Sequence, residues 1–180
     1  MKGEKTLDVN KREKTLFSRE MIDIRVKELG KEISESYNDK NLIVVSLLRG
    51  SFIFAADLVR ELSIPVEIDF ITTASYGNDE ISSGLVQIVQ DLRTNIEGKD
   101  ILIVDDIMDS GHTLKRVIEH LEEKNPNSVK VCVMLDKPSR RQVELSPDYT
   151  GFSIPDVFIV GYGLNYGNYY RNVPYIFTFD

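Results

Sequence analysis

The stretch ILIVDDIMDSGHTL, from Ile101 to Leu114, decides the fold. Its first four residues are apolar, as expected of a strand that is buried on both faces of a parallel sheet. Two adjacent acids, Asp105 and Asp106, come directly after them, and a third acid stands at Asp109. The segment that follows has helical spacing. This order predicts a strand that ends at a row of carboxylates, with a helix that begins a few residues later.

Strand-like and helix-like segments alternate on both sides of this stretch. Ser18, a typical N-cap residue, precedes apolar residues with helical spacing, and FIFAADLVREL (52–62) also has helical character. Short apolar runs predict strands at 42–48, 66–71, 85–91, 129–135, 157–161 and 175–179. We therefore expect an α/β fold, with a parallel sheet as its core and helices on both faces. The polar stretch Thr72–Gly84 is expected to be a long loop, and the first 15 or so residues a partly ordered arm.

The composition is that of an ordinary soluble domain. The 180 residues are most simply one domain, 1–180, of which 42% are hydrophobic and 28% charged. No apolar run is long enough to cross a bilayer, so we expect no membrane partner. The polar amino terminus is unlike a signal peptide, and the single Cys132 has no intramolecular disulfide partner, so a cytoplasmic location is expected. The net charge of −7 argues against a nucleic-acid partner, although it allows a small phosphorylated ligand.

The segment after the acid pair has the features of a phosphate site. Ligands of parallel sheets bind beyond the carboxyl ends of the strands, where these residues fall. The run Asp109–Thr113 supplies consecutive N–H groups, Gly111 permits a tight turn, and a helix that begins near Thr113 would favour an anion at its amino end. The simpler alternative is a helix cap beside a solvated loop. Against it, two adjacent acids at a buried strand repel each other unless a cation or hydroxyl donors share the site.

Five segments, taken together, resemble the type I phosphoribosyltransferases. VDDIMDSGHT (104–113) resembles the phosphoribosyl-diphosphate motif of that family. The remaining segments stand in the family's order: LLRGS (47–51) resembles its pyrophosphate loop, ASYGN (74–78) its flexible catalytic loop, DKPSRR (136–141) its purine-side lysine segment, and IPDVFIVGYGLNYGNYYRN (154–172) its base and pyrophosphate segment. The resemblance runs from about Leu42 to the carboxyl terminus, and it is to the hypoxanthine-guanine branch. It implies the type I phosphoribosyltransferase fold, with a small hood formed by the N- and C-terminal segments.

The resemblance also implies a reaction. Ribose 5-phosphate would pass from 5-phosphoribosyl 1-diphosphate to hypoxanthine, guanine or both, as in purine salvage, with release of pyrophosphate. Asp105 and Asp106 would bind the ribose hydroxyls, and Asp109 would act as general base or acid near purine N7. The 5-phosphate would be bound by Ser110, Gly111, His112 and Thr113. We expect His112 to contribute its amide rather than a catalytic ring, because it occupies a variable position of the motif.

The diphosphate side of the site is implied in the same way. Its residues would be Leu48, Arg49, Gly50 and Arg171, and family members use a non-proline cis peptide after the leucine. A diphosphate calls for Mg²⁺, held by Asp105, Asp106 and substrate oxygens. Asn165 stands where the family commonly has an aspartate that helps to hold a metal. An asparagine can still coordinate through its carbonyl oxygen but brings no charge, so metal affinity at that position is in doubt.

The purine would lie against Phe158, with backbone groups of Ile159 along its edge. Lys137 would donate to purine O6 and so favour 6-oxopurines. Ser75 and Tyr76 would belong to the catalytic loop, which is expected to close over the reacting centre and exclude water. Homodimers or homotetramers are usual in the family, so we expect one of these.

Three other functions are compatible with parts of the sequence. A nucleotide-sensing regulator with the same fold would need a basic surface or an added DNA-binding domain, and a uracil-using enzyme would not need Lys137 and the Phe158 segment. ILIVDD also resembles the first strand and acid pair of a phosphoacceptor signalling domain. That fold needs more residues after the acids than the 75 from Asp106 to Asp180.

Overall fold

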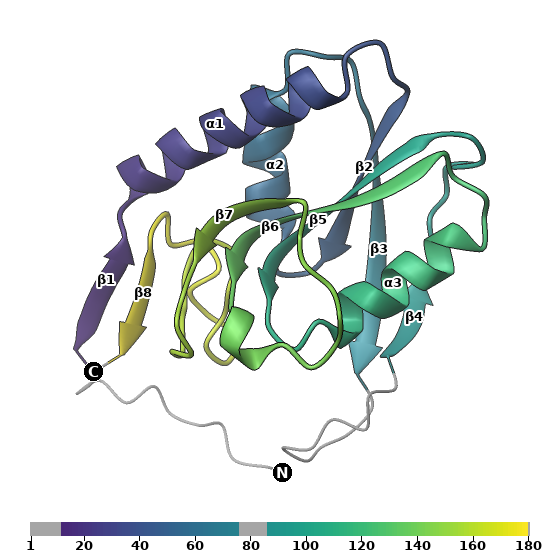
Figure 1. Ribbon diagram of the computed structural model, residues 1–180. Helices are drawn as coiled ribbons and strands as arrows, with labels where there is room; N and C mark the ends of the chain where they lie inside the picture. The colour runs from purple at the N-terminus through teal and green to yellow at the C-terminus, as the bar shows by residue number, and fades with distance from the viewer. Residues whose placement is uncertain (1–11, 76–85, 180) are drawn as a thin grey trace.

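The structure, a computed structural model, describes residues 12–75 and 86–179. A six-stranded sheet with the order β4-β3-β2-β5-β6-β7 lies at its centre, and every strand is parallel to its neighbours except β4 (Figure 1). The strands of this sheet are β2 Leu42–Leu48, β3 Glu67–Ser75, β4 Val86–Gln90, β5 Asp100–Met108, β6 Ser128–Asp136 and β7 Tyr149–Ser153. The helices are α1 Arg19–Ser36, α2 Phe52–Glu61, α3 His112–Glu122 and the short 3-10 helix η1 Pro138–Arg140. The parallel α/β architecture predicted from the sequence is confirmed.

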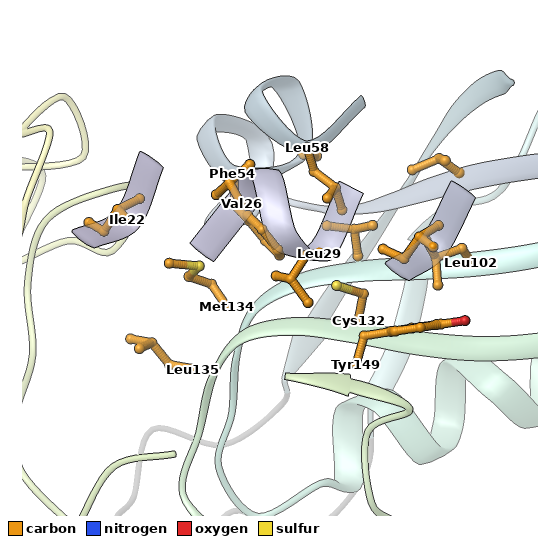
Figure 2. Close-up of a cluster of buried hydrophobic side chains, with 14 of the residues drawn as sticks. Ile22, Val26, Leu29, Phe54, Leu58, Leu102, Cys132, Met134, Leu135 and Tyr149 are labelled. Carbon is orange, nitrogen blue, oxygen red and sulfur yellow. The ribbon is translucent and has the colours of Figure 1, made fainter. Parts of the chain in front are cut away.

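The helices cover both faces of the sheet, so the central strands are buried on both sides. On β2, Leu42 and Val44 belong to a core with α1 and α2, whereas Ile43 and Val45 belong to a second core with α3. This alternation explains why β2 is a continuous apolar run rather than a pattern of period two. Figure 2 shows the first core, where α1 and α2 residues face β6 and β7. Each fully buried Leu or Ile contributes about 1.5–3 kcal/mol to folding.

Two serines fix the positions at which α1 and α2 begin. The Ser18 hydroxyl accepts a hydrogen bond from the Met21 amide at 3.3 Å, so α1 begins with the predicted side-chain cap. Ser51, which precedes α2, is buried; its hydroxyl donates to the Leu47 carbonyl at 2.6 Å and lies 2.8 Å from the Ser46 hydroxyl. These contacts hold the turn between β2 and α2 in one position, and that turn contains the predicted diphosphate loop.

Helix α3 is tied to the edge of the sheet by an acidic residue just after β4. Asp91 lies 3.0 Å from Nε2 of His120 and accepts a hydrogen bond of 2.7 Å from Lys124. Partial burial opposes ionisation of Asp91, but the hydrogen bonds from these partners outweigh it and lower its pKa to about 2. The carboxylate therefore stays ionised and paired throughout the neutral range.

The two ends of the described chain form a small separate sheet. Strand β1 (Glu13–Phe17) pairs antiparallel with β8 (Ile176–Phe179), and both lie beside the carboxyl-terminal side of the main sheet (Figure 1). This sheet is the predicted hood. Aromatic rings pack within it, including Phe177 and Phe179 with centroids 5.2 Å apart.

The structure corrects five details of the prediction. Strand β5 continues through the acids to Met108, and Thr72–Ser75 extends β3 instead of opening a loop. The apolar run Val157–Gly161 is not a strand; only an isolated bridge, Val160 to Phe177, connects it to the hood. The polar strand β7 and the strand β1 in the expected amino-terminal arm were not predicted, because neither has a local apolar pattern.

Within the described ranges, no helix combines the length and apolar character needed to cross a membrane.

Candidate active site

A pocket of about 320 Å³ opens at the carboxyl ends of β2, β3 and β5, where α3 begins. Figure 1 shows these strand ends on one edge of the sheet. The pocket is lined by Leu47, Leu48, Arg49, Gly50, Thr73, Asp105, Asp106, Ile107, Met108, Asp109, Ser110, Gly111, Thr113 and Leu114. Two segments that are distant in sequence, 47–51 and 104–113, were predicted to act together, and both contribute to this cavity.

The acid pair lies in the carboxyl-terminal half of β5 and lines this pocket. Asp105 is 8% exposed, and its carboxylate accepts a 3.0 Å hydrogen bond from the Asp106 amide. Burial, and then the adjacent charge of Asp106, raise the pKa of Asp105 well above the usual range for an aspartate. Burial also raises the pKa of Asp106, although backbone hydrogen bonds and the charge of Arg171 oppose that rise. A buried acid beside a half-buried one favours a ligand that brings positive charge or hydroxyl donors.

The loop between β2 and α2 packs directly on this pair. A Cβ on Gly50 would lie 1.8 Å from Oδ2 of Asp106, so only glycine leaves room for the carboxylate. The peptide bond between Leu48 and Arg49 is cis, as the family resemblance implied. Arg49 is exposed beside the pocket. The loop therefore presents a cation and backbone groups next to the two acids.

The start of α3 has free amide groups where a phosphate was expected. Helix α3 begins at His112, one residue before the expected Thr113, and Gly111 precedes it with φ 89°. Among the described residues, the amides of 110–113 donate to no other group, as is usual for the first turn of a helix. The His112 ring turns away from that turn to contact Gln142 at 3.1 Å. The ring contact with Gln142 leaves the His112 amide available to an anion, which agrees with an amide role for this residue.

The segment after β6 holds this loop from outside. The Ser110 carbonyl accepts from the Gln142 amide at 3.0 Å, and the Asp109 carbonyl accepts from Arg141 Nη1 at 2.5 Å. Arg141 also pairs with Asp136 at the end of β6. With the carbonyls engaged on the outer side, the amides of the loop remain available to an anion.

The predicted purine-side residues begin with Lys137, directly after the carboxyl end of β6. Lys137 is 7% exposed, which is unusual for lysine, and its Nζ lies 3.5 Å from Oδ1 of Asp156. The Lys137 amide donates to the carbonyl of Met108 at 3.0 Å, which joins this segment to the end of β5. Ile159 is buried, whereas the Phe158 ring is 57% exposed. The exposed ring is free to stack on a planar base.

Within residues 12–75 and 86–179, Asp109 has one cationic partner. Its Oδ1 accepts a hydrogen bond of 3.0 Å from Nε of Arg140, and Nη1 of Arg140 lies 3.4 Å from Oδ2 of Asp156. Arg140 stands in the quoted DKPSRR segment and Asp156 in the quoted IPD, but neither has a pattern that would have predicted the pairing. Thr73 lines the pocket from β3, and no motif in the sequence had indicated a role for this residue.

The carboxyl-terminal segment contributes Arg171 near the acid pair. Its Nη1 donates to the carbonyl of Gly163 at 2.5 Å, and its charge acts on Asp106. Asn165 is exposed, and its Nδ2 donates to the carbonyl of Gly167 at 2.6 Å within the same turn. Its side chain therefore stabilises the turn.

Two predicted catalytic residues fall at or beyond the limit of the described chain. The backbone of Ser75 ends β3, beside the pocket-lining Thr73. Tyr76 lies outside the described residues. The described part of the chain has no cluster of three or more His, Cys, Asp or Glu side chains that could hold a metal ion. A metal in this pocket would therefore depend on the acid pair and on oxygens of a ligand.

Known proteins share this arrangement of elements. The phosphoribosyl transferase domain family matches residues 14–167. A hypoxanthine phosphoribosyltransferase of Buchnera aphidicola is 52% identical over 165 residues, which are 91% of this chain and 93% of that protein. The hypoxanthine-guanine phosphoribosyltransferase of Bacillus subtilis is 46% identical over 164 residues, 91% of each chain. A crystal structure of a hypoxanthine phosphoribosyltransferase from Staphylococcus aureus superposes with a TM-score of 0.90 at 42% identity, over 93% of this chain and 91% of that one.

Proposed function

This chain belongs to the phosphoribosyl transferase family, and from that premise we propose that it is a purine salvage enzyme. It transfers ribose 5-phosphate from 5-phosphoribosyl 1-diphosphate to hypoxanthine, guanine or both, and it releases pyrophosphate. Relatives that carry these names match about nine-tenths of the chain. The observation that carries the proposal is the convergence, at one edge of the sheet, of an acid pair with one buried member, a turn of free amides and a buried lysine.

The sugar diphosphate occupies the pocket at the end of β5. Its 5-phosphate accepts hydrogen bonds from the amides of residues 110–113 and from the hydroxyls of Ser110 and Thr113, at the positive end of α3. The ribose hydroxyls donate to Asp105 and Asp106, which supply the negative charge that an oxocarbenium-like carbon needs. The diphosphate lies toward Leu48–Gly50 and Arg171, where a cationic group offsets its charge.

Magnesium fits the donor set at the acid pair. Asp105 and Asp106 are hard oxygen donors, and no described lysine or arginine forms an ion pair with either of them. The ion, when bound, neutralises charge on the diphosphate oxygens. Asn165 is the third candidate ligand, but its amide already donates to Gly167, and it lacks the charge of an aspartate. We therefore assign Mg²⁺ mainly to the acid pair and to substrate oxygens.

The purine lies on the other side of the pocket. Phe158 stacks on its face, backbone groups of Ile159 contact its edge, and Lys137 donates to O6. An ammonium at O6 favours a carbonyl over an amino group, which separates 6-oxopurines from adenine. Asp109 acts as general base or acid at N7: it accepts the N7 proton when N9 forms its bond to the ribose carbon, and it returns that proton in the reverse reaction. Ser75 and Tyr76 complete the catalytic set as the loop that excludes water.

The proposal extends to the domain organisation, assembly and location of the protein. We propose a single domain over 1–180, a homodimer or homotetramer, and a cytoplasmic location with no nucleic-acid partner. The buried Cys132, which forms no disulfide among the described residues, and the net charge of −7 support the last two. Light scattering on the purified protein measures the assembly, and a monomer would contradict that part.

The deciding experiment is pyrophosphate release with Mg²⁺ and phosphoribosyl diphosphate, against hypoxanthine, guanine, xanthine, adenine and uracil. We expect release with hypoxanthine or guanine and little with adenine. Release with uracil alone would favour the uracil-using enzyme. No release with any base, while the sugar diphosphate still binds, would favour a nucleotide-sensing regulator.

A further inference from the structure

Four charged side chains form a continuous chain across the purine side of the site. Arg140 Nε donates to Oδ1 of Asp109 at 3.0 Å, and Nη1 of the same guanidinium lies 3.4 Å from Oδ2 of Asp156. The other oxygen of Asp156 lies 3.5 Å from Nζ of Lys137. One carboxylate therefore holds two cations, of which one contacts the proposed acid–base group and the other is the proposed O6 donor.

The contact to Asp109 leaves that residue able to react. Arg140 binds only Oδ1, and within the described residues no hydrogen bond or ion pair reaches Oδ2. A base with one oxygen fixed and the other free has the geometry of a base held by an orienting group. The rigid guanidinium can bind two carboxylates at once through different N–H groups, which a lysine ammonium at this position would do poorly.

The backbone around Arg140 supports a fixed position for the guanidinium. Arg140 is the last residue of η1, and its amide donates to the Lys137 carbonyl at 3.1 Å. The next residue, Arg141, binds the Asp109 carbonyl and pairs with Asp136. The turn that carries Arg140 is thus attached to the loop that carries Asp109 by contacts that do not involve Arg140 itself.

We propose that Arg140 is a positioning residue for the proton transfer at Asp109, and that Asp156 positions Arg140 and Lys137 together. The inference rests on the proposed function, because it assigns a role within that reaction. Arg140 and Asp109 are 50% and 42% exposed, so solvent screens their attraction and the effect is modest. Loss of the orienting contact should slow the chemical step by about fivefold.

The test compares single-turnover rates of nucleotide formation with the Michaelis constants of both substrates. Arg140→Gln should lower the single-turnover rate about fivefold and leave the KM for phosphoribosyl diphosphate unchanged. Asp156→Asn should lower the rate similarly and also raise the KM for hypoxanthine, because it releases Lys137 as well. Arg60→Gln is the matched control: Arg60 is an exposed arginine that pairs with an aspartate on α2, outside this chain of contacts.

A double-mutant cycle separates orientation from a general charge effect. If Arg140 acts through Asp109, Arg140→Gln should have no further effect on the rate in an Asp109→Asn background. Equal fivefold losses in both backgrounds would overturn the inference, as would an unchanged rate in Arg140→Gln alone. Inactivity of the unmodified protein with every base would instead overturn the proposed function, and this inference with it.

Discussion

Replacing Gly50 by alanine tests how closely the diphosphate loop and the acid pair fit together. The new Cβ would lie 1.8 Å from Oδ2 and 2.5 Å from Cγ of Asp106, where ordinary contacts begin near 3.4 Å. The loop or the carboxylate must therefore move by about 1.6 Å, the difference between 3.4 and 1.8 Å. A misplacement of about 1 Å in an active site can lower the rate about 100-fold. Gly50 is not in the left-handed region, so alanine is compatible with its backbone and the fold should persist.

The assay is kcat/KM for phosphoribosyl diphosphate at saturating hypoxanthine, with a melting temperature for each variant. We expect Gly50→Ala to lose about 100-fold in kcat/KM, which is about 2.7 kcal/mol of transition-state stabilisation. Gly98→Ala is the control, because its Cβ would meet nothing within 4 Å but φ is +66°, so it should lose stability and keep its activity. A Gly50→Ala enzyme within about threefold of the unmodified protein would refute the reasoning, because it would show that neither the loop nor the carboxylate had shifted by the roughly 1 Å that can lower a rate about 100-fold.

Three further predictions concern the acids, the aromatic ring and the edge of the sheet. Asp109→Asn should lower turnover about 100-fold or more while sugar-diphosphate binding measured by calorimetry is kept, whereas Asp105→Asn and Asp106→Asn should weaken that binding too; equal binding in all three would contradict this division. Phe158→Ala should raise the KM for hypoxanthine about tenfold or more through lost stacking, and an unchanged KM would remove Phe158 from the base site. Asp91→Asn should lower the melting temperature at pH 7; because the folded pKa is lowered to about 2 from 3.8, the difference should close as pH falls from about 4 to 2, and a constant difference would argue against the pairing.

The elements predicted correctly from sequence are those whose burial leaves a local pattern. Strand β2 and the stretch Ile101–Val104 of β5 are buried on both faces and therefore form apolar runs, and α1 combines a serine cap with one apolar face. Strand β7, YTGFS, has no such pattern, because its place depends on pairing with β6 rather than on its own residues. The run at 157–161 shows the opposite error, since apolar residues can be buried beneath a hood without joining a sheet.

In the site, as in the fold, features with a local sequence pattern were predicted and features that depend on packing were not. Ordered motifs predicted that 47–51 and 104–113 would meet, and the pocket at the end of β5 contains both. Contacts between side chains were not predictable. Arg140 and Asp156 lie in segments that the resemblance had singled out, but nothing in the sequence indicates that they join Asp109 to Lys137. Such pairings depend on how two loops pack in space, and sequence spacing carries no information on that.

The measurement that tests the central claim most directly is a crystal structure of the protein with IMP bound. We predict that the phosphate accepts hydrogen bonds from the amides of residues 110–113 and that the ribose hydroxyls contact Asp105 and Asp106. The base should lie between Phe158 and Lys137. A nucleotide bound elsewhere, for example in the cavity of about 450 Å³ between α1, α2 and Tyr162, with the pocket at β5 empty, would contradict it.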